Sequence, residues 1–213
     1  MKISPVIYLP DFTNGYVLNM FDHHQLDETM EGLVDFGTPV VAAATGYLAS
    51  TAIIAAQRIN ISSVVTIPEP FGRCVNVGSS AAGTVTIIGR DYLNQVMTEV
   101  VTAIIGTVSS NKAFKYIDAI LSGTLAGNVT LGPAPRLGFP FAISTVTQEY
   151  DDGVLVATPT IVAPVQTDPA TSSTGDVRGL VTPTGVLNGV RNIQMTCRFR
   201  QENAGGLYGV KQA

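Results

Sequence analysis

One segment near the end of the sequence constrains its own conformation through a strict alternation of apolar and polar side chains. The apolar residues of this segment are Ile193, Met195, Cys197 and Phe199. Every position between and beside them, from 192 to 200, is polar. Successive side chains of a strand point to opposite faces, so the pattern predicts a strand with one buried and one solvent-facing side. On this interpretation Cys197 is a core residue, and Arg198 and Arg200 are exposed.

From about residue 61 onward, short runs rich in Val, Ile and Thr recur between Gly and Pro residues. They predict strands over 62–67, 73–77, 84–88, 95–102, 112–122, 127–132 and 154–162, the last interrupted at Pro159. The runs 84–88 and 95–102 predict a hairpin, and the polar stretch 163–175 predicts a long exposed loop. Because long helical patterns are missing between these runs, we expect an all-β domain over residues 61–213, an antiparallel β-sandwich or barrel.

The segment that precedes this domain, residues 39–60, is rich in Ala. Val41, Ala44, Leu48, Thr51 and Ala55 recur at helical spacing, which predicts a short helical or loop segment. The uncharged stretch between Asp35 and Arg58 is long enough to cross a bilayer. Its Ala, Gly, Thr and Pro content contributes little to insertion, so we expect no membrane helix.

Residues 1–38 combine aromatic side chains with turn-forming residues and show no sustained period of 2 or 3.6. This pattern is typical of an extended N-terminal arm that buries its aromatic side chains on a neighbouring surface. Our hypothesis is that Phe12, Tyr16 and Phe21 bind that partner.

Few residues carry catalytic or metal-binding chemistry. The only histidines, His23 and His24, are adjacent in the arm, and a solvated turn is favoured there over a metal site with Asp22 and Asp27. Asp151-Asp152-Gly153 is typical of a turn, because no closing Glu follows at the spacing of a Ca²⁺ loop. No phosphate-binding glycine motif is present. We therefore expect no catalytic residues, no metal, no cofactor and no enzymatic activity.

The two cysteines, Cys74 and Cys197, form no redox or metal-binding motif. A disulfide between them would depend on a proximity that the sequence does not define. Free Cys behaves as a small hydrophobic side chain, so two buried thiols are favoured.

Charge is scarce in this chain. Only 13% of residues are Asp, Glu, Lys or Arg, against roughly 25% in an average soluble domain. A surface with so few charges favours a component of an assembly, in which partners cover much of the chain. The net charge is −4 and no cluster of Lys and Arg is dense enough to neutralise phosphates, so we expect no nucleic-acid binding.

The region from Gly72 to Gly132 also has a familiar order of motifs. The motifs are Gly72-Arg73-Cys74-Val75-Asn76-Val77, the hairpin from Gly83 to Glu99, Lys112-Ala113-Phe114, and Gly127-Asn128-Val129-Thr130-Leu131-Gly132. This order resembles the cement (decoration) proteins of tailed-bacteriophage capsids, and the Ala-rich segment, residues 175–179 and residues 207–213 resemble them too. The similarity covers about residues 40–213. The chain departs from the family at Asn94, usually Gly, and at Ile88, usually Thr.

The resemblance implies a jelly-roll-like sandwich on the outside of the virion, where the chain binds the major capsid protein and stabilises the shell. It also implies a homo-oligomer, a dimer or trimer, on that shell. The alternatives are a neck, head-completion or tail structural protein, and a receptor- or glycan-binding β module.

Overall fold

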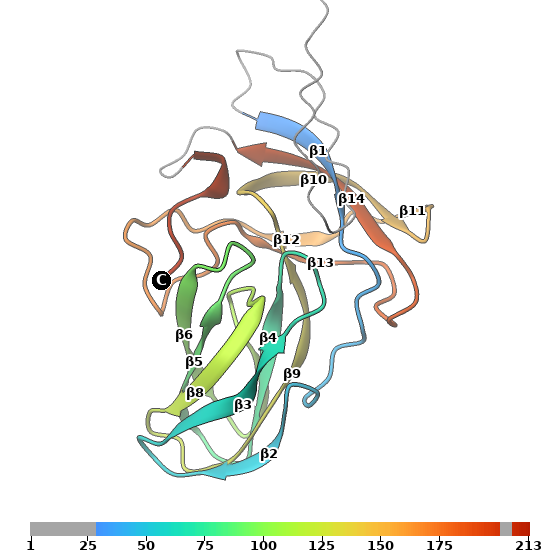
Figure 1. The fold of residues 1–213 in the computed structure, drawn as a ribbon. Coiled ribbons are helices and arrows are strands. Elements are labelled where there is room, and N and C mark those ends of the chain that lie inside the picture. The colour runs from blue at the N-terminus through green and yellow to red at the C-terminus, as the bar shows by residue number, and fades with distance from the viewer. Residues whose placement is uncertain (1–28, 201–205) are drawn as a thin grey trace, which may run out of the picture.

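The structure of the chain is a computed structural model that describes residues 29–200 and 206–213, and nearly all regular structure there is β (Figure 1). A short 3₁₀ turn, η1 (Gly206–Tyr208), follows the last strand. The strands are β1 (Thr29–Asp35), β2 (Leu48–Ile53), β3 (Arg58–Thr66), β4 (Arg73–Ser79), β5 (Gly83–Arg90), β6 (Val96–Ala103), β7 (Gly106–Ser109), β8 (Tyr116–Ser122), β9 (Gly127–Gly138), β10 (Ile143–Asp151), β11 (Val154–Val156), β12 (Thr160–Val162), β13 (Leu180–Thr182) and β14 (Ile193–Arg200).

These strands form three antiparallel sheets. Sheet A has the order β1-β14-β10-β11, and sheet C has the order β3-β8-β5-β6. Sheet B has the order β12-β13-β9-β4-β7, and β2 also pairs with β9. The all-β antiparallel sandwich class predicted from the sequence is confirmed, and so is the hairpin, in which β5 pairs with β6 along their whole length.

Two hydrophobic cores lie along the same long strand, β9. Val129 and Leu131, in its first half, pack in a core between sheets B and C. Leu137, near its end, packs in a second core with sheet A. In Figure 1 sheet A lies at the top of the molecule and sheet C below it. The chain is therefore one elongated body with two ends of different composition.

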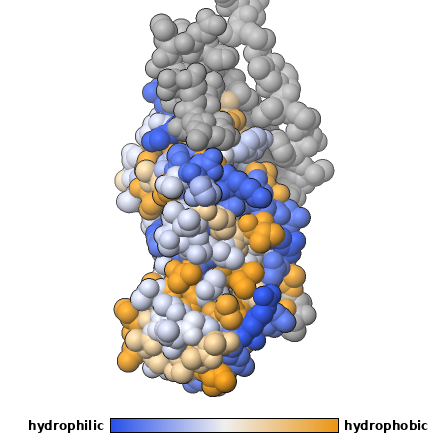
Figure 2. All heavy atoms as spheres, turned by 90° about the vertical axis from the view of Figure 1, so that its left-hand side faces the viewer, coloured by the Kyte–Doolittle hydropathy of each residue, from blue (hydrophilic) through white to orange (hydrophobic). Residues whose placement is uncertain are grey.

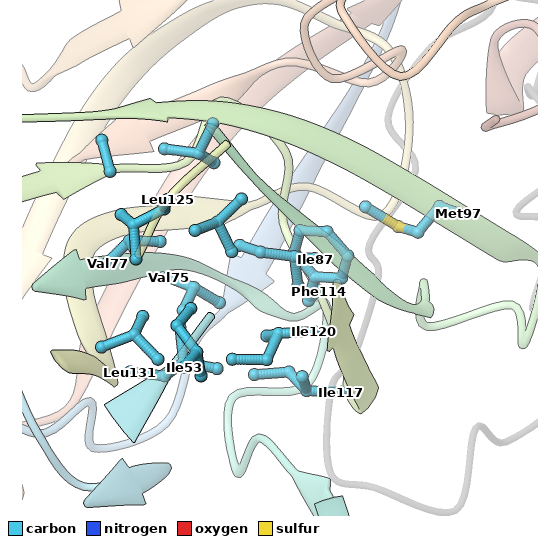
Figure 3. Close-up of a cluster of buried hydrophobic side chains, with 14 of the residues drawn as sticks. Ile53, Val75, Val77, Ile87, Met97, Phe114, Ile117, Ile120, Leu125 and Leu131 are labelled. Carbon is cyan, nitrogen blue, oxygen red and sulfur yellow. The ribbon is translucent and has the colours of Figure 1, made fainter. Parts of the chain in front are cut away.

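The first core is aliphatic. Its central side chains, among them Ile87, Ile117 and Ile120, surround Phe114 and are fully buried. Figure 3 shows these side chains gathered between the strands. Each fully buried side chain of this size stabilises the fold by about 1.5–3 kcal/mol relative to an exposed one.

The second core is aromatic. Phe139 contacts both Phe36 and Phe199 edge to face, with ring centroids 5.8 and 6.3 Å apart. Phe141 packs against Phe199 in the same manner at 5.4 Å. Such pairs add about 0.5–1.5 kcal/mol beyond the area that they bury.

Strand β14 has the alternation that the sequence predicts. Cys197 and Phe199 are fully buried, and Arg198 is exposed on the other face, where its guanidinium pairs with Glu31 of β1. Arg200 is half-buried. Cys74 and Cys197 are buried free thiols, and burial raises the pKa of both, which leaves them unreactive.

Two expectations for the first part of the chain need correction. Residues 29–35, placed in the arm, form β1, pair with β14 and send Met30 and Val34 into the second core. The helical interpretation of residues 39–60 was wrong. Residues 48–53 are strand β2, residues 58–60 begin β3, and the preceding segment is irregular. The backbone N–H groups of Ala43 and Tyr47 bond to carbonyl groups of β9, so pairing with that strand overrides the helical spacing. No helix of the described residues has the length and apolar character to span a membrane.

The burial pattern of β14 yields a direct test. Replacing Phe199 with Ala should lower the free energy of unfolding by about 3–5 kcal/mol, because it removes a ring that packs against two others. Replacing its neighbour Arg198 with Ala should lower it by less than about 1 kcal/mol, because that ion pair is exposed. Urea unfolding of both variants measures the difference, and equal losses would contradict this account of the strand.

Candidate interaction surface

The side chains predicted to bind a partner, Phe12, Tyr16 and Phe21, lie outside the described residues, as do His23 and His24. Within residues 29–200 and 206–213, no group of three or more His, Cys, Asp or Glu side chains is placed to hold a metal ion. Asp151-Asp152-Gly153 is the turn between β10 and β11, with Asp152 and Gly153 in the left-handed conformation.

The most concentrated polar chemistry is buried, where sheet C meets the segment 163–178. Five charged side chains make up this region, which we call the polar seam: Asp91, Glu99, Lys112, Asp176 and Arg178. Lys112 Nζ donates hydrogen bonds to three backbone carbonyls, those of Thr98 (3.1 Å), Thr171 (2.9 Å) and Ala213 (2.8 Å).

The acidic members of the polar seam bind backbone N–H groups. Glu99 accepts hydrogen bonds from the backbone N–H groups of Asn111 (2.6 Å) and Lys112 (2.9 Å). Asp176 accepts from those of Ala113 (2.9 Å) and Arg178 (2.8 Å). Each carboxylate therefore fixes the path of a loop, which is the role that buried charges usually have.

An ion pair completes the seam. Arg178 Nη2 lies 2.6 Å from Asp91 Oδ2, and the guanidinium stacks 4.8 Å from the centre of the Tyr92 ring. All five charged side chains are at most 4% exposed, so no substrate in solution can reach them. The polar seam is a structural network, and the segment 163–175, predicted as an exposed loop, is partly held down by it.

A different kind of surface lies at the end of the molecule far from sheet A. Four loops meet there: β2–β3 (54–57), β4–β5 (80–82), β6–β7 (104–105) and β8–β9 (123–126). We call this surface the distal tip. Its loops carry no charged residue, and Ile54, Ile104 and Ile105 are 69%, 57% and 76% exposed. In Figure 2 the lower end of the molecule is mainly orange, tan and near-white.

The loops 54–57, 80–82 and 123–126 of the distal tip are bonded to one another or to an adjoining strand. Ala56 N–H donates to the carbonyl of Gly123 (3.0 Å), and Gly123 N–H donates to the carbonyl of Thr84 (2.8 Å). Ser80 and Asn128 exchange two further hydrogen bonds, one from each backbone N–H. A surface held in this way loses little conformational entropy when it binds a partner. The distal tip is therefore a preorganised apolar surface.

The sequence carries little sign of the distal tip. The only local signal is the pair Ile104-Ile105 between two strands, where turn residues are expected. The other contributors are Ala, Ser, Thr and Gly residues from loops far apart in the sequence, which only the fold brings together.

A second surface feature is a groove of about 440 Å³ on the outer face of sheet A. Its lining includes Glu31, Tyr150, Gln194 and Thr196. These side chains belong to neighbouring strands, since Tyr150 pairs with Gln194 across β10 and β14. The groove is shallow and of mixed polar and apolar character, and its lining contains hydrogen-bonding groups and an aromatic ring of the kinds that saccharide sites use.

The buried carboxyl of Glu99 predicts a pH dependence. Burial raises its pKa to about 7, from an ordinary value of 4.5, against the opposing effect of the two N–H groups that it accepts. Between pH 4.5 and 7 the Glu99 carboxyl is therefore protonated in the folded chain and ionised in the unfolded chain. The free energy of unfolding should fall as the pH rises through that range. Glu99→Gln should remove this dependence.

Urea midpoints at pH 5 and pH 8 measure the effect of Glu99. The free energy of unfolding obtained from these curves should be lower at pH 8 than at pH 5, by roughly a few kcal/mol in the parent chain and by clearly less in Glu99→Gln. Glu31→Gln, at an exposed carboxylate, serves as the control. An unchanged pH dependence in Glu99→Gln would contradict the assignment.

No known protein family, no curated protein and no solved structure matches this chain.

Proposed function

We propose that this chain is a structural virion protein that binds the outside of the major capsid protein shell of a tailed bacteriophage and stabilises it. The observation that carries the proposal is the distal tip, whose loops expose three isoleucines and carry no charged residue, with the exposed Arg58 at its margin. The resemblance of residues 40–213 to capsid cement proteins supplies the partner. Apolar exposed patches of this kind on a soluble chain mark interaction sites.

The physical properties of the distal tip suit repeated binding around a shell. A surface without charges can be covered without desolvating unpaired ions, which is the costly step in burying charged groups. Each contact can be modest, because several contacts from one bound molecule raise the overall affinity. A stable interface buries about 1,200–2,000 Å² in total, so we propose that the arm provides the remaining area.

In this proposal the arm contributes through Phe12, Tyr16 and Phe21, which bind a neighbouring subunit. An extended segment that folds on its partner gains contact area at the cost of ordering. Because residues 29–35 form β1, the part that can be removed without loss of the sandwich is 1–28.

The distal tip can be tested by the double substitution Ile104→Ser and Ile105→Ser. We expect at least about tenfold weaker binding to particles that lack this protein, because a loss of about 1.4 kcal/mol suffices for that factor. Val154→Ser with Leu155→Ser is the matched control, since these adjacent residues are 65% and 58% exposed at the β10–β11 hairpin of sheet A. Co-sedimentation with the particles measures both, and equal binding by the two double variants would refute the role of the tip.

Removal of residues 1–28 tests the arm. The shortened chain should keep the urea midpoint of the full chain, because every described core residue remains. Its binding to the shell should be lost or strongly reduced. Retained binding at full strength would show that Phe12, Tyr16 and Phe21 are not anchors.

Two other functions remain distinct alternatives. A neck, head-completion or tail protein would have similar surfaces, and the molar ratio of this chain to the shell protein in purified particles separates it from a cement protein. The groove on sheet A favours a receptor- or glycan-binding module as the second candidate. Absence of the chain from particles, together with saturable binding of a saccharide, would support that candidate over the capsid role.

A further inference from the structure

Strand β6 is an edge strand of sheet C, and its open edge is covered by two other parts of the chain. β6 pairs with β5 on one side only. On the other side the backbone N–H of Thr98 donates to the carbonyl of Ala213 (2.8 Å), and that of Val100 donates to the carbonyl of Ser172 (2.9 Å). We call residues 207–213 the strap. The strap and the loop around Ser172 together take the place of a neighbouring strand (Figure 1).

Lys112 fastens this cover. Its ammonium group donates to the carbonyl of Thr98 on β6, that of Thr171 in the loop and that of Ala213 in the strap. Thr98 is thus capped twice, at its N–H by Ala213 and at its carbonyl by Lys112. These two backbone groups are the ones that a residue exchanges with its partner in an antiparallel pair.

The strap is anchored at its start and only lightly packed at its end. Leu207 packs against the second core and its carbonyl accepts from the backbone N–H of Ala142 (2.9 Å), while the Tyr208 ring contacts that of Phe141 with centroids 5.2 Å apart. The end, residues 210–213, packs through a small cluster in which Val210 and Ala213 meet Ala170 and Val177. Gln212 is 2% exposed, yet among the described residues neither its Nε2 nor its Oε1 has a hydrogen-bond partner. A buried polar group without a partner costs about 1–3 kcal/mol. Elements with few apolar contacts and uncompensated polar groups open most readily.

We propose that the strap is a releasable cover, and that the β6 edge beneath it is the surface through which two copies of this chain pair. Release of the strap frees the N–H of Thr98, and departure of the Lys112 side chain frees its carbonyl. Because Lys112 also holds the carbonyl of Thr171, its departure lets the neighbouring loop withdraw and frees the N–H of Val100. The β6 strands of two copies then join antiparallel across a two-fold axis. This inference concerns the chain alone and does not depend on the proposed capsid function.

The side chains of β6 favour a second copy as the occupant. Its outward positions are Val96, Thr98, Val100 and Thr102, which are uncharged residues of high strand preference. Charged side chains, which usually keep edge strands from pairing, are missing from those positions. In an antiparallel pair of identical strands, residue i of one copy faces residue j of the other and residue j faces residue i, so the uncharged face of one copy meets the same uncharged face of the other.

The test uses the full chain with Lys112→Met, and Lys115→Met as the matched control. Lys115 likewise donates to backbone carbonyls, those of Ile67 (2.7 Å) and Glu69 (2.9 Å), but neither contact touches the strap. We expect Lys112→Met to dimerise at least about tenfold more tightly than the parent chain in sedimentation equilibrium, and Lys115→Met to remain unchanged. A chain shortened to residue 209 loses the Ala213 carbonyl that accepts from Thr98 but keeps Lys112 on the Thr98 carbonyl and keeps Leu207 and Tyr208 on the second core. It should dimerise more tightly than the parent chain and less tightly than Lys112→Met.

Gln212→Leu should act in the opposite direction, because it removes the uncompensated amide and tightens the strap. Amide hydrogen exchange at Thr98 and Val100 reports the cover directly. We expect both amides to exchange faster in dilute Lys112→Met than in the parent chain. At concentrations where that variant is dimeric, we expect them to be protected again. Two results would overturn the proposal. One is unchanged exchange in the Lys112→Met and shortened chains; the other is faster exchange in chains that stay monomeric with native circular dichroism.

Discussion

The long strand β9 is the constraint on which the rest of the structure depends. It pairs with β2, β4 and β13, and it supplies buried side chains to both hydrophobic cores. Twelve residues in extended conformation span about 40 Å, which is enough to reach from the distal tip to the second core. β9 belongs to sheet B, and it packs against sheet C along its first half and against sheet A near its end. The two ends of the molecule are therefore held in one body while their surfaces differ.

The polar seam shows how the chain uses the few charges that it has. Lys112, Glu99 and Asp176 are placed against backbone groups of loops, not against solvent. Burying such groups is favourable only when their hydrogen bonds are made, and here each charged group binds at least two backbone atoms. This arrangement fixes irregular segments that have little hydrophobic area of their own, and Lys112 joins three such segments at one point.

Much of the fold could be predicted from the sequence where the side-chain period was intact. β14 alternates without interruption, and the β5–β6 hairpin is bounded by clear turn residues, so both were predicted. β10 was missed because two bulges, after Ile143 and after Val146, break its alternation. β1 was missed because a glycine, Gly32, occupies an inward position and Leu33 faces outward, which hides the pattern. The distal tip could not be predicted, because four separate loops form it and no one of them is unusual except Ile104-Ile105.

The low charge of the chain has a sharper meaning once burial is considered. Residues 29–200 and 206–213 contain 22 of the 28 charged residues of the sequence, and nine of these 22 are buried. The surface is therefore poorer in charge than the composition suggests. Several of the remaining exposed charges, such as Glu31 and Arg198, lie on sheet A, whereas the loops of the distal tip have none. Solubility requires charge at only one end if the other end is covered by a partner. This asymmetry favours a role in an assembly over a role as a freely diffusing binding module. A freely diffusing module would need charged residues over its whole surface to stay in solution.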